Sequence, residues 1–187
     1  MAAPRTKAKV VVVGDEGVGK RSLVHRSSID PYSDSYVASF GAKVSKKEIL
    51  LPVRLRDGTY LDLILWTVEA GKLRGRGRAF ASLAVGIFAV CDATRRETLV
   101  HLVDFVKIIH AVSGKIPLVV VANKWDLEGK RQIGVDEVEA LARRQGSESF
   151  LTSATTGANV EAAFQSLGER IVVFRRAKAE RASQGPP

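Results

Sequence analysis

This chain of 187 residues has little of what stabilises secreted or membrane-spanning proteins. It contains a single cysteine, Cys91, which excludes a disulfide within the chain. Cys91 ends the apolar run at 85–91, so we expect a buried thiol in a reducing compartment. No apolar stretch approaches the roughly 20 residues that span a bilayer, and no signal-type hydrophobic region follows the amino terminus. These absences predict a soluble, cytoplasmic protein.

Anchoring and metal-binding cysteines are lacking as well. Residues 183–187 contain none, so we expect no prenyl anchor and only peripheral contact with a membrane. His25, His101 and His110 have no ligand-like spacing with cysteine or carboxylates. The sequence therefore assigns these histidines no chemistry.

Positive charge is in excess, with a formal net charge of +9 at pH 7. The excess favours an acidic partner, which could be a protein surface, an anionic lipid or a nucleic acid. The basic residues at the two ends are interpreted as solvated, because like-charged ends are commonly disordered. The length and composition fit one domain. We expect a disordered N-terminus at 1–7, a domain at 8–176 and a flexible tail at 177–187.

The order of apolar patterns predicts an α/β fold. A β-branched run at 10–13 leads through a glycine loop to a helix beginning near Gly19, and the continuous apolar runs at 85–91 and 117–122 are typical of strands buried on both faces. Segments 43–51 and 60–66 predict an antiparallel pair around the Asp-Gly turn at 57–58. Apolar residues at helical spacing in 99–110 and 160–174 predict two helices packed on the sheet.

The glycine loop is almost a phosphate-binding P-loop, with the sequence Gly14-Asp15-Glu16-Gly17-Val18-Gly19-Lys20-Arg21. In the G-x-x-x-x-G-K-[ST] pattern, backbone N–H groups and the lysine hold phosphate, while the closing hydroxyl coordinates Mg²⁺. Arg21 replaces that hydroxyl, and Ser22 comes one residue later, about 100° further around the helix. The loop therefore predicts nucleotide binding with an impaired Mg²⁺ site.

Two further motifs follow predicted strands. Asn123-Lys124-Trp125-Asp126 comes directly after the strand at 117–122, and Ser153-Ala154 follows a short strand at 149–152. Ligands of open α/β sheets bind at this carboxyl edge. Together with the glycine loop, from about residue 9 to 174, the chain resembles the Ras-like small GTPases. The resemblance implies a three-layer P-loop fold with a mostly parallel six-stranded sheet and one antiparallel edge strand.

The resemblance also implies GTP and GDP as ligands and assigns roles at the base. Asp126 would accept hydrogen bonds from the guanine N1 and exocyclic amine, and Asn123 would bridge the base and the P-loop. The stem of Lys124 would lie against the ring, and the N–H of Ala154, after Ser153, would donate to the guanine O6.

In the first switch region of this family, the resemblance places Ser39 where a hydroxyl reaches Mg²⁺ and Tyr32 where an aromatic ring packs against the base. Tyr36 matches an aromatic residue near the γ-phosphate. The alternative is that all three belong to an ordinary polar loop, since loops are rich in such residues.

The second switch region departs from the family pattern Trp-Asp-x-x-Gly-Gln. The chain has Trp66-Thr67-Val68-Glu69-Ala70-Gly71-Lys72, in which neither Thr67 nor Val68 restores the aspartate. The alternative is that Glu69 reaches the metal indirectly, although a shifted carboxylate on a longer stem rarely reproduces that geometry. Gly71 is retained as a nucleotide-binding residue, and Lys72 replaces the glutamine that positions the attacking water. No catalytic residue can be named, and we expect intrinsic GTP hydrolysis to be slow or absent.

Glu16 adds a negative charge close to where the γ-phosphate would lie. One hypothesis is that Arg21, paired with Glu16, supplies fixed positive charge in place of Mg²⁺ and makes nucleotide binding metal-independent. The alternative is that Arg21 turns outward to solvent and the phosphates are held less tightly.

The sequence thus predicts a GTP/GDP switch or adaptor that binds effector or regulator proteins with acidic surfaces. The alternative is a pseudoGTPase scaffold that binds nucleotide without metal or not at all. Such a scaffold would act through interaction with proteins or through peripheral contact with an anionic membrane. Nucleic acid is not favoured, because the basic run at 71–78 lacks interleaved aromatic residues.

Overall fold

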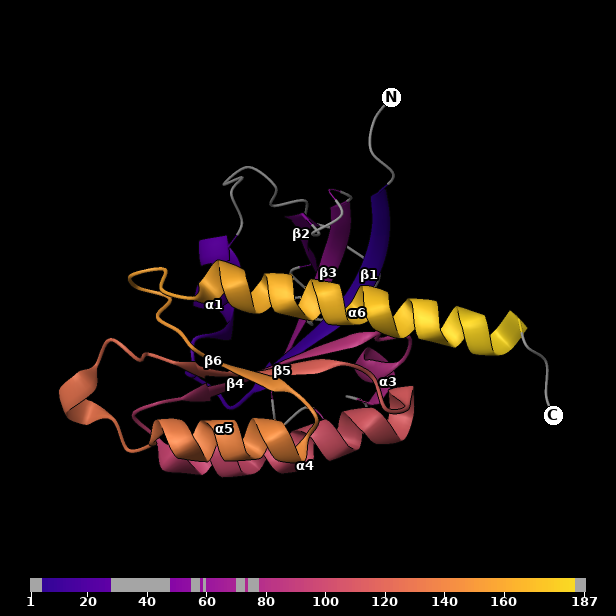
Figure 1. Cartoon of the computed structure of the whole chain (residues 1–187). Helices are drawn as coiled ribbons and strands as arrows, with labels where there is room; N and C mark the ends of the chain where they lie inside the picture. The colour runs from indigo at the N-terminus through magenta and orange to yellow at the C-terminus, as the bar shows by residue number, and fades with distance from the viewer. Residues whose placement is uncertain are drawn as a thin grey trace, which may run out of the picture.

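The computed structural model describes residues 5–27, 48–54, 58, 60–69, 73 and 78–183. These residues form one six-stranded sheet in the order β2-β3-β1-β4-β5-β6, with helices on both faces (Figure 1). The strands are β1 Arg5–Gly14, β2 Glu48–Arg54, β3 Tyr60–Glu69, β4 Gly86–Asp92, β5 Leu118–Asn123 and β6 Glu148–Leu151. The helices are α1 Lys20–Ser27, α3 Arg78–Ala81, α4 Arg96–Ser113, α5 Val135–Arg144 and α6 Val160–Ser183, with a short 3₁₀ turn at Glu128–Lys130.

The pairing of the strands confirms the predicted fold class. β1 pairs in parallel with β3 and β4, and β4, β5 and β6 continue the parallel ladder. Edge strand β2 pairs antiparallel with β3. Of the predicted turn between them, the structure describes Gly58, which has a positive φ of 82°.

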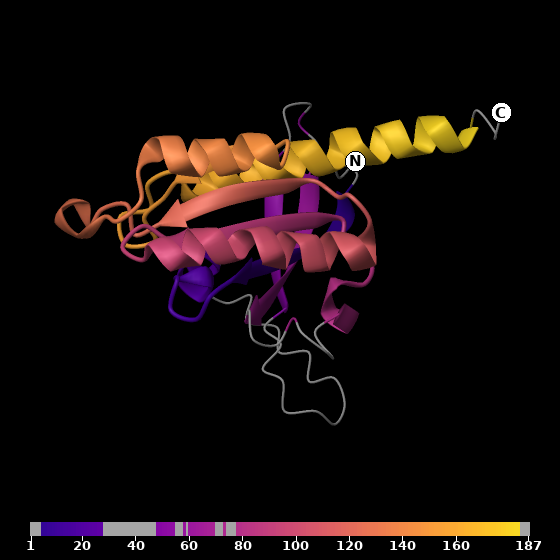
Figure 2. The same ribbon diagram turned by 90° about the horizontal axis from the view of Figure 1, so that it is seen from below.

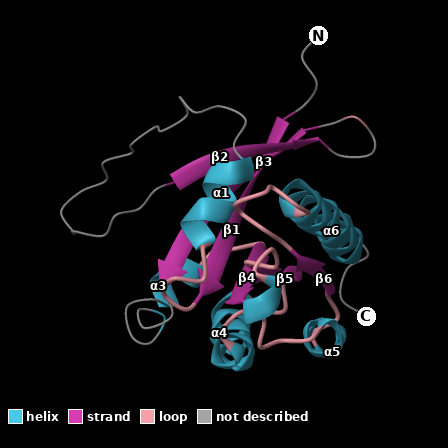
Figure 3. Cartoon of the chain, turned by 90° about the vertical axis from the view of Figure 1, so that its left-hand side faces the viewer, coloured by secondary structure: helices cyan, strands magenta, loops and turns pink. Residues whose placement is uncertain are grey.

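The alternation of side chains along β1 divides the core between the two faces of the sheet. Val10 and Val12 belong to the cluster formed with α1 and α6, whereas Val11 and Val13 belong to the cluster formed with α3, α4 and α5. Figure 3 shows these helices on opposite sides of the sheet. All four valines are fully buried, which explains why a continuous β-branched run forms a central strand.

Both ends of the described chain are more regular than the sequence predicted. Strand β1 begins at Arg5, in register with Tyr60 of β3, so residues 5–7 belong to the sheet. Helix α6 continues through Ser183, past the boundary expected at 176, and its C-terminal end extends beyond the sheet (Figure 2). Residues 177–183 are mostly Ala, Lys, Glu and Arg, which have high helix propensity and explain the extension. Helix α5 was not predicted.

Cys91 is fully buried, as expected from its apolar surroundings. Burial, together with the nearby Asp92 carboxylate, raises the pKa of this thiol to about 12. Within the ranges that the structure describes, no helix combines the length and the apolar character needed to cross a membrane.

Candidate nucleotide-binding site

The glycine loop lies between the end of β1 and the start of α1, at the carboxyl edge of the sheet. At two positions its backbone passes so close to neighbouring atoms that no side chain would fit. A Cβ on Gly14 would lie 2.1 Å from the carbonyl oxygen of Val90, and a Cβ on Gly19 would lie 2.3 Å from Nδ2 of Asn123. Gly19 also has a positive φ of 96°. The loop is therefore built as a phosphate cradle requires, with the close backbone approach that glycine permits.

Lys20 lies under this loop. Its ammonium donates to the carbonyl oxygens of Gly14 at 2.8 Å and of Asp15 at 2.6 Å. The residue is only 7% exposed. The loop thus wraps around a buried positive charge, which is the charge expected for a lysine that meets phosphate.

Asn123 joins three segments of the edge. Its Nδ2 donates to the carbonyl oxygen of Val18 at 2.9 Å, so the predicted link to the P-loop is present. Its Oδ1 accepts from the N–H of Ala154 at 3.1 Å, the N–H that the family resemblance assigns to guanine O6. Ser153 is buried and accepts through Oγ from the N–H of Thr156, which stabilises the turn that presents Ala154.

Lys124 adopts a positive φ of 64° as the chain leaves β5. Its Nζ reaches Oδ2 of Asp92 at 2.5 Å. Two residues further along, Asp126 is exposed at the sheet edge. An exposed carboxylate there is free of the core and accessible to a ligand, as the predicted contact with guanine requires.

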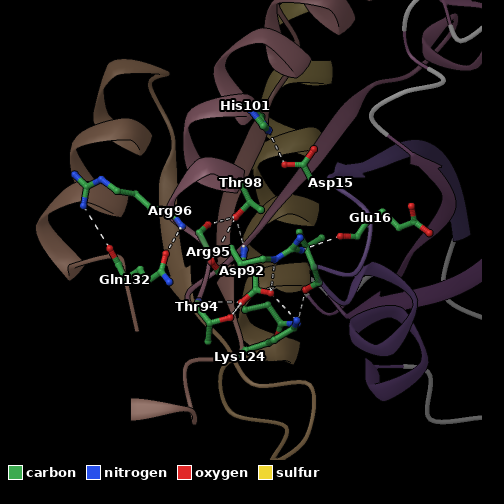
Figure 4. A network of polar contacts seen from close by, with 12 residues as sticks. Asp15, Glu16, Asp92, Thr94, Arg95, Arg96, Thr98, His101, Lys124 and Gln132 are labelled. Carbon is green, nitrogen blue, oxygen red and sulfur yellow. Dashed lines mark hydrogen bonds and ion pairs between the residues drawn. The ribbon is translucent and has the colours of Figure 1, made fainter. Parts of the chain in front are cut away.

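Asp92, at the end of β4, is the hub of a polar network that the sequence did not predict (Figure 4). Its carboxylate is 1% exposed and accepts from Lys124, from the N–H and hydroxyl of Thr94 at 2.9 and 2.7 Å, and from Nε of Arg95 at 3.1 Å. Burial alone would raise the pKa of Asp92, but the hydrogen bonds from Lys124, Thr94 and Arg95 outweigh it and hold the pKa below its usual value. The carboxylate therefore stays ionised.

Two contacts tie this region to the P-loop. Nη2 of Arg95 donates to the carbonyl oxygen of Glu16 at 2.8 Å, and Nδ1 of His101 lies 2.8 Å from Oδ2 of Asp15. Figure 4 shows both side chains directed at the loop. His101 was assigned no chemistry from sequence, because Asp15 is far away along the chain.

The hypothetical pairing of Arg21 with Glu16 is not found in the part of the chain that the structure describes. Arg21 and Ser22, in the first turn of α1, are exposed, as is Glu16. Among the described residues no ion pair joins Arg21 to Glu16, and no cluster of three or more His, Cys, Asp or Glu could hold a metal ion. The other predicted residues, Tyr32, Tyr36, Ser39, Gly71 and Lys72, lie outside the described residues.

Nucleotide binding and Mg²⁺ binding depend on different residues of this site. The glycines, Lys20 and Asn123 fit a bound nucleotide. Arg21 offers five N–H donors and no oxygen at the place where the P-loop pattern puts a hydroxyl that coordinates Mg²⁺.

A glycine loop between the first strand and first helix, facing an Asn-Lys-x-Asp segment at the carboxyl edge of a parallel sheet, defines a P-loop nucleotide-binding domain. The profile of the Ras family matches residues 9–173, and the chain belongs to this family. Among its relatives, Ras-related protein Rab-8B of Homo sapiens is 31% identical over 88% of this chain and 78% of its own length. Ras-related protein Rab-13 of Bos taurus is 27% identical over 96% of this chain and 87% of its own length.

Membership of the family makes the chain a small GTP-binding switch protein. The family implies GTP and GDP as ligands, usually with Mg²⁺, and effector and regulator proteins as partners.

Proposed function

We propose that this chain is a GTP/GDP-binding switch or adaptor whose Mg²⁺ site is impaired and whose intrinsic hydrolysis is slow or absent. The proposal depends chiefly on the identity and position of Arg21. It is exposed in the first turn of α1, at the place of the metal-binding hydroxyl, in a P-loop whose other parts are assembled.

Polar contacts of Lys20 and Asn123, which packing of the core does not require, support the retention of nucleotide binding. Lys20 donates to the carbonyl oxygens of Gly14 and Asp15, and these bonds hold its ammonium beneath the loop, where the P-loop pattern places the lysine that meets phosphate. Asn123 bonds both to the loop, at Val18, and to the N–H of Ala154, and so fixes the distance between these two segments. These residues would hold the phosphates and the base, and Asp126 would select guanine.

Loss of the metal is supported by a second position. In either alignment of the second switch, the aspartate that orients a water on Mg²⁺ falls on Thr67 or Val68. Both lie in β3, paired with Val12 and Val13 of β1, and Val68 is buried. Neither residue has a carboxylate to hold a metal-bound water, so two of the oxygen groups that normally serve Mg²⁺ are missing.

Slow hydrolysis follows from Lys72 in the sequence. A lysine ammonium attracts a γ-phosphate, but it has no acceptor with which to orient the attacking water. We propose that the signal of this protein therefore depends on nucleotide occupancy and exchange more than on its own turnover. Its net charge of +9 supports partners with acidic surfaces.

The test is calorimetric titration of nucleotide-stripped protein with GTP and GDP, each with Mg²⁺ and with excess EDTA. Chromatography of the incubated nucleotide then measures turnover. Binding that persists in EDTA with GTP left intact supports the proposal, and the extreme form of that result is the metal-independent pseudoGTPase. Metal-dependent binding with GDP appearing at an ordinary intrinsic rate would overturn it. No binding of either nucleotide would leave the scaffold alternative.

A further inference from the structure

The turn after β4 and the first half of α4 contact the P-loop from outside, through one side chain each. Arg95 reaches the Glu16 carbonyl and His101 reaches the Asp15 carboxylate, so two consecutive loop residues are held by one neighbouring segment (Figure 4). Neither contact belongs to the phosphate cradle itself. Both nevertheless act on the stretch of backbone that must be shaped for phosphate.

The guanidinium of Arg95 is held at two edges. Its Nε donates to Oδ2 of Asp92 at 3.1 Å, and its Nη2 donates to the Glu16 carbonyl oxygen at 2.8 Å. Nη2 also lies 3.6 Å from the place of a Cβ on Gly17. Because the guanidinium is planar and rigid, the contact with Asp92 sets the direction in which Nη2 points. A lysine has one nitrogen and cannot bridge these two acceptors in the same way.

The same carboxylate oxygen of Asp92 also accepts from Lys124 at 2.5 Å. Asp92 therefore joins the arginine that contacts the P-loop to the lysine of the predicted base-binding segment. Since Asp92 is buried, both cations are held in place from the inside of the protein and not by a mobile surface group.

We propose that Arg95 is a positioning residue for the nucleotide, which holds the P-loop in its phosphate-binding shape and slows nucleotide release. The peptide bond between Glu16 and Gly17 is planar and trans, so the Glu16 carbonyl and the Gly17 N–H point in opposite directions. By holding the carbonyl toward β4, Arg95 turns the Gly17 N–H toward the interior of the loop, where a phosphate accepts it. His101 contacts the loop one residue earlier, through the carboxylate of Asp15.

The predicted effect on nucleotide release rests on the proposed nucleotide binding. The predicted effect on the shape of the loop does not depend on nucleotide. The first experiment measures release of a fluorescent GDP analogue from the full chain. Arg95→Ala should accelerate release about tenfold, the scale of a lost charge-assisted hydrogen bond. Arg95→Lys should remain fast, because the charge stays while the two-edged geometry is lost.

Arg96 provides the matched control. It is the next residue, also an arginine, but it bonds Glu137 and the Gln132 carbonyl on the side of α5. Arg96→Ala should leave release within about twofold of the wild type, the effect of a surface contact. Equal acceleration by Arg95→Ala and Arg96→Ala would overturn the proposal, as would wild-type release from Arg95→Lys, which would leave charge alone as the cause.

The second experiment needs no nucleotide. Backbone order parameters from ¹⁵N relaxation report motion of residues 14–19 on the picosecond to nanosecond scale. In the stripped protein, Arg95→Ala should lower them at Glu16 and Gly17 while Arg96→Ala leaves them unchanged. If the wild type binds no nucleotide, the proposed function fails but this measurement still decides the role of Arg95. Unchanged order parameters in Arg95→Ala would overturn that role.

Discussion

Residue 19 and Asn123 are so close that a Cβ on Gly19 would lie 2.3 Å from the amide nitrogen of Asn123. That nitrogen is the donor that links β5 to the Val18 carbonyl. The glycine is therefore needed at this position for two reasons: its positive φ of 96° and the space that the asparagine occupies.

Gly19→Ala should displace Asn123 and break its hydrogen bond to Val18. We expect a loss of stability of about 1–3 kcal/mol, the range for overpacking a tight site. Nucleotide affinity should fall about tenfold or more, which is about 1.4 kcal/mol. Urea denaturation and titration with GDP would measure the two effects.

Gly114→Ala is the control, because Gly114 also has a positive φ, of 76°, but nothing lies within 4 Å of its Cβ position. It should cost only backbone strain, about 1–3 kcal/mol because its ψ of −180° lies in a region of backbone space that is almost restricted to glycine, and leave GDP affinity unchanged. Similar affinity loss in both variants would show that strain, and not contact with Asn123, is responsible.

The ionised state of Asp92 makes part of the stability depend on pH. Its pKa is lower in the folded chain than the ordinary value near 3.9, so its stabilising contribution is complete above about pH 4 and is lost as the pH falls through the folded value. Asp92→Asn should destabilise the protein by about 1–3 kcal/mol near pH 7, since Lys124 and Arg95 lose a charged acceptor. The difference from the wild type should shrink below pH 4 in urea denaturation.

Asp104→Asn is the appropriate comparison for this titration. Asp104 is exposed and faces Lys107 at 3.8 Å, so its replacement should change stability by less than about 0.5 kcal/mol at every pH. A gap between wild type and Asp92→Asn that is constant from pH 7 to pH 3 would contradict the assigned role of Asp92.

Local patterns were sufficient to predict the sheet and most of the helices. The run at 10–13 and the run at 85–91 became adjacent central strands because residues buried on both faces leave a continuous apolar pattern. Helix α5 could have been found in the same way, since its buried residues Val138, Leu141 and Ala142 have helical spacing. The length of α6 was missed because its last two turns depend on propensity and not on an apolar face.

The cradle could be predicted, but the contacts around it could not. Gly14 to Lys20 and Asn123 are readable because each belongs to a short motif with fixed spacing. Arg95 meets Glu16 across 79 positions and His101 meets Asp15 across 86, and no local rule pairs residues at such separations. The pairing of Arg21 with Glu16 was one of two hypotheses, based on the need to offset the negative charge of Glu16. In the structure both side chains are exposed with no ion pair between them.

Cys91 should be unreactive in the native protein. Its thiol is fully buried and its pKa is raised to about 12, so the thiolate that reacts with disulfide reagents is scarce and inaccessible at pH 8. We expect no labelling by a chromogenic disulfide in native buffer and one equivalent in guanidinium chloride. Rapid labelling of the native chain would mean that β4 opens often, which its place in the sheet centre opposes.

Restoring the metal-binding hydroxyl at residue 21 is the sharpest test of the nucleotide chemistry. Arg21→Ser replaces a group without acceptors by an oxygen at the position where the P-loop pattern coordinates Mg²⁺. Because Arg21 is exposed and no ion pair is found for it among the described residues, the change should move the melting temperature by only a few degrees.

We expect Arg21→Ser to make GTP binding sensitive to EDTA, with at least a tenfold stronger affinity in Mg²⁺ than in EDTA, while the wild type shows less than a threefold difference. Arg21→Ala separates the two causes, since it removes the guanidinium without adding oxygen. If Arg21 supplies positive charge to the phosphates, Arg21→Ala should bind GTP more weakly than the wild type in EDTA. If Arg21 simply faces solvent, Arg21→Ala and the wild type should bind equally, and the metal dependence of the wild type should then match that of Arg21→Ala in calorimetric titration.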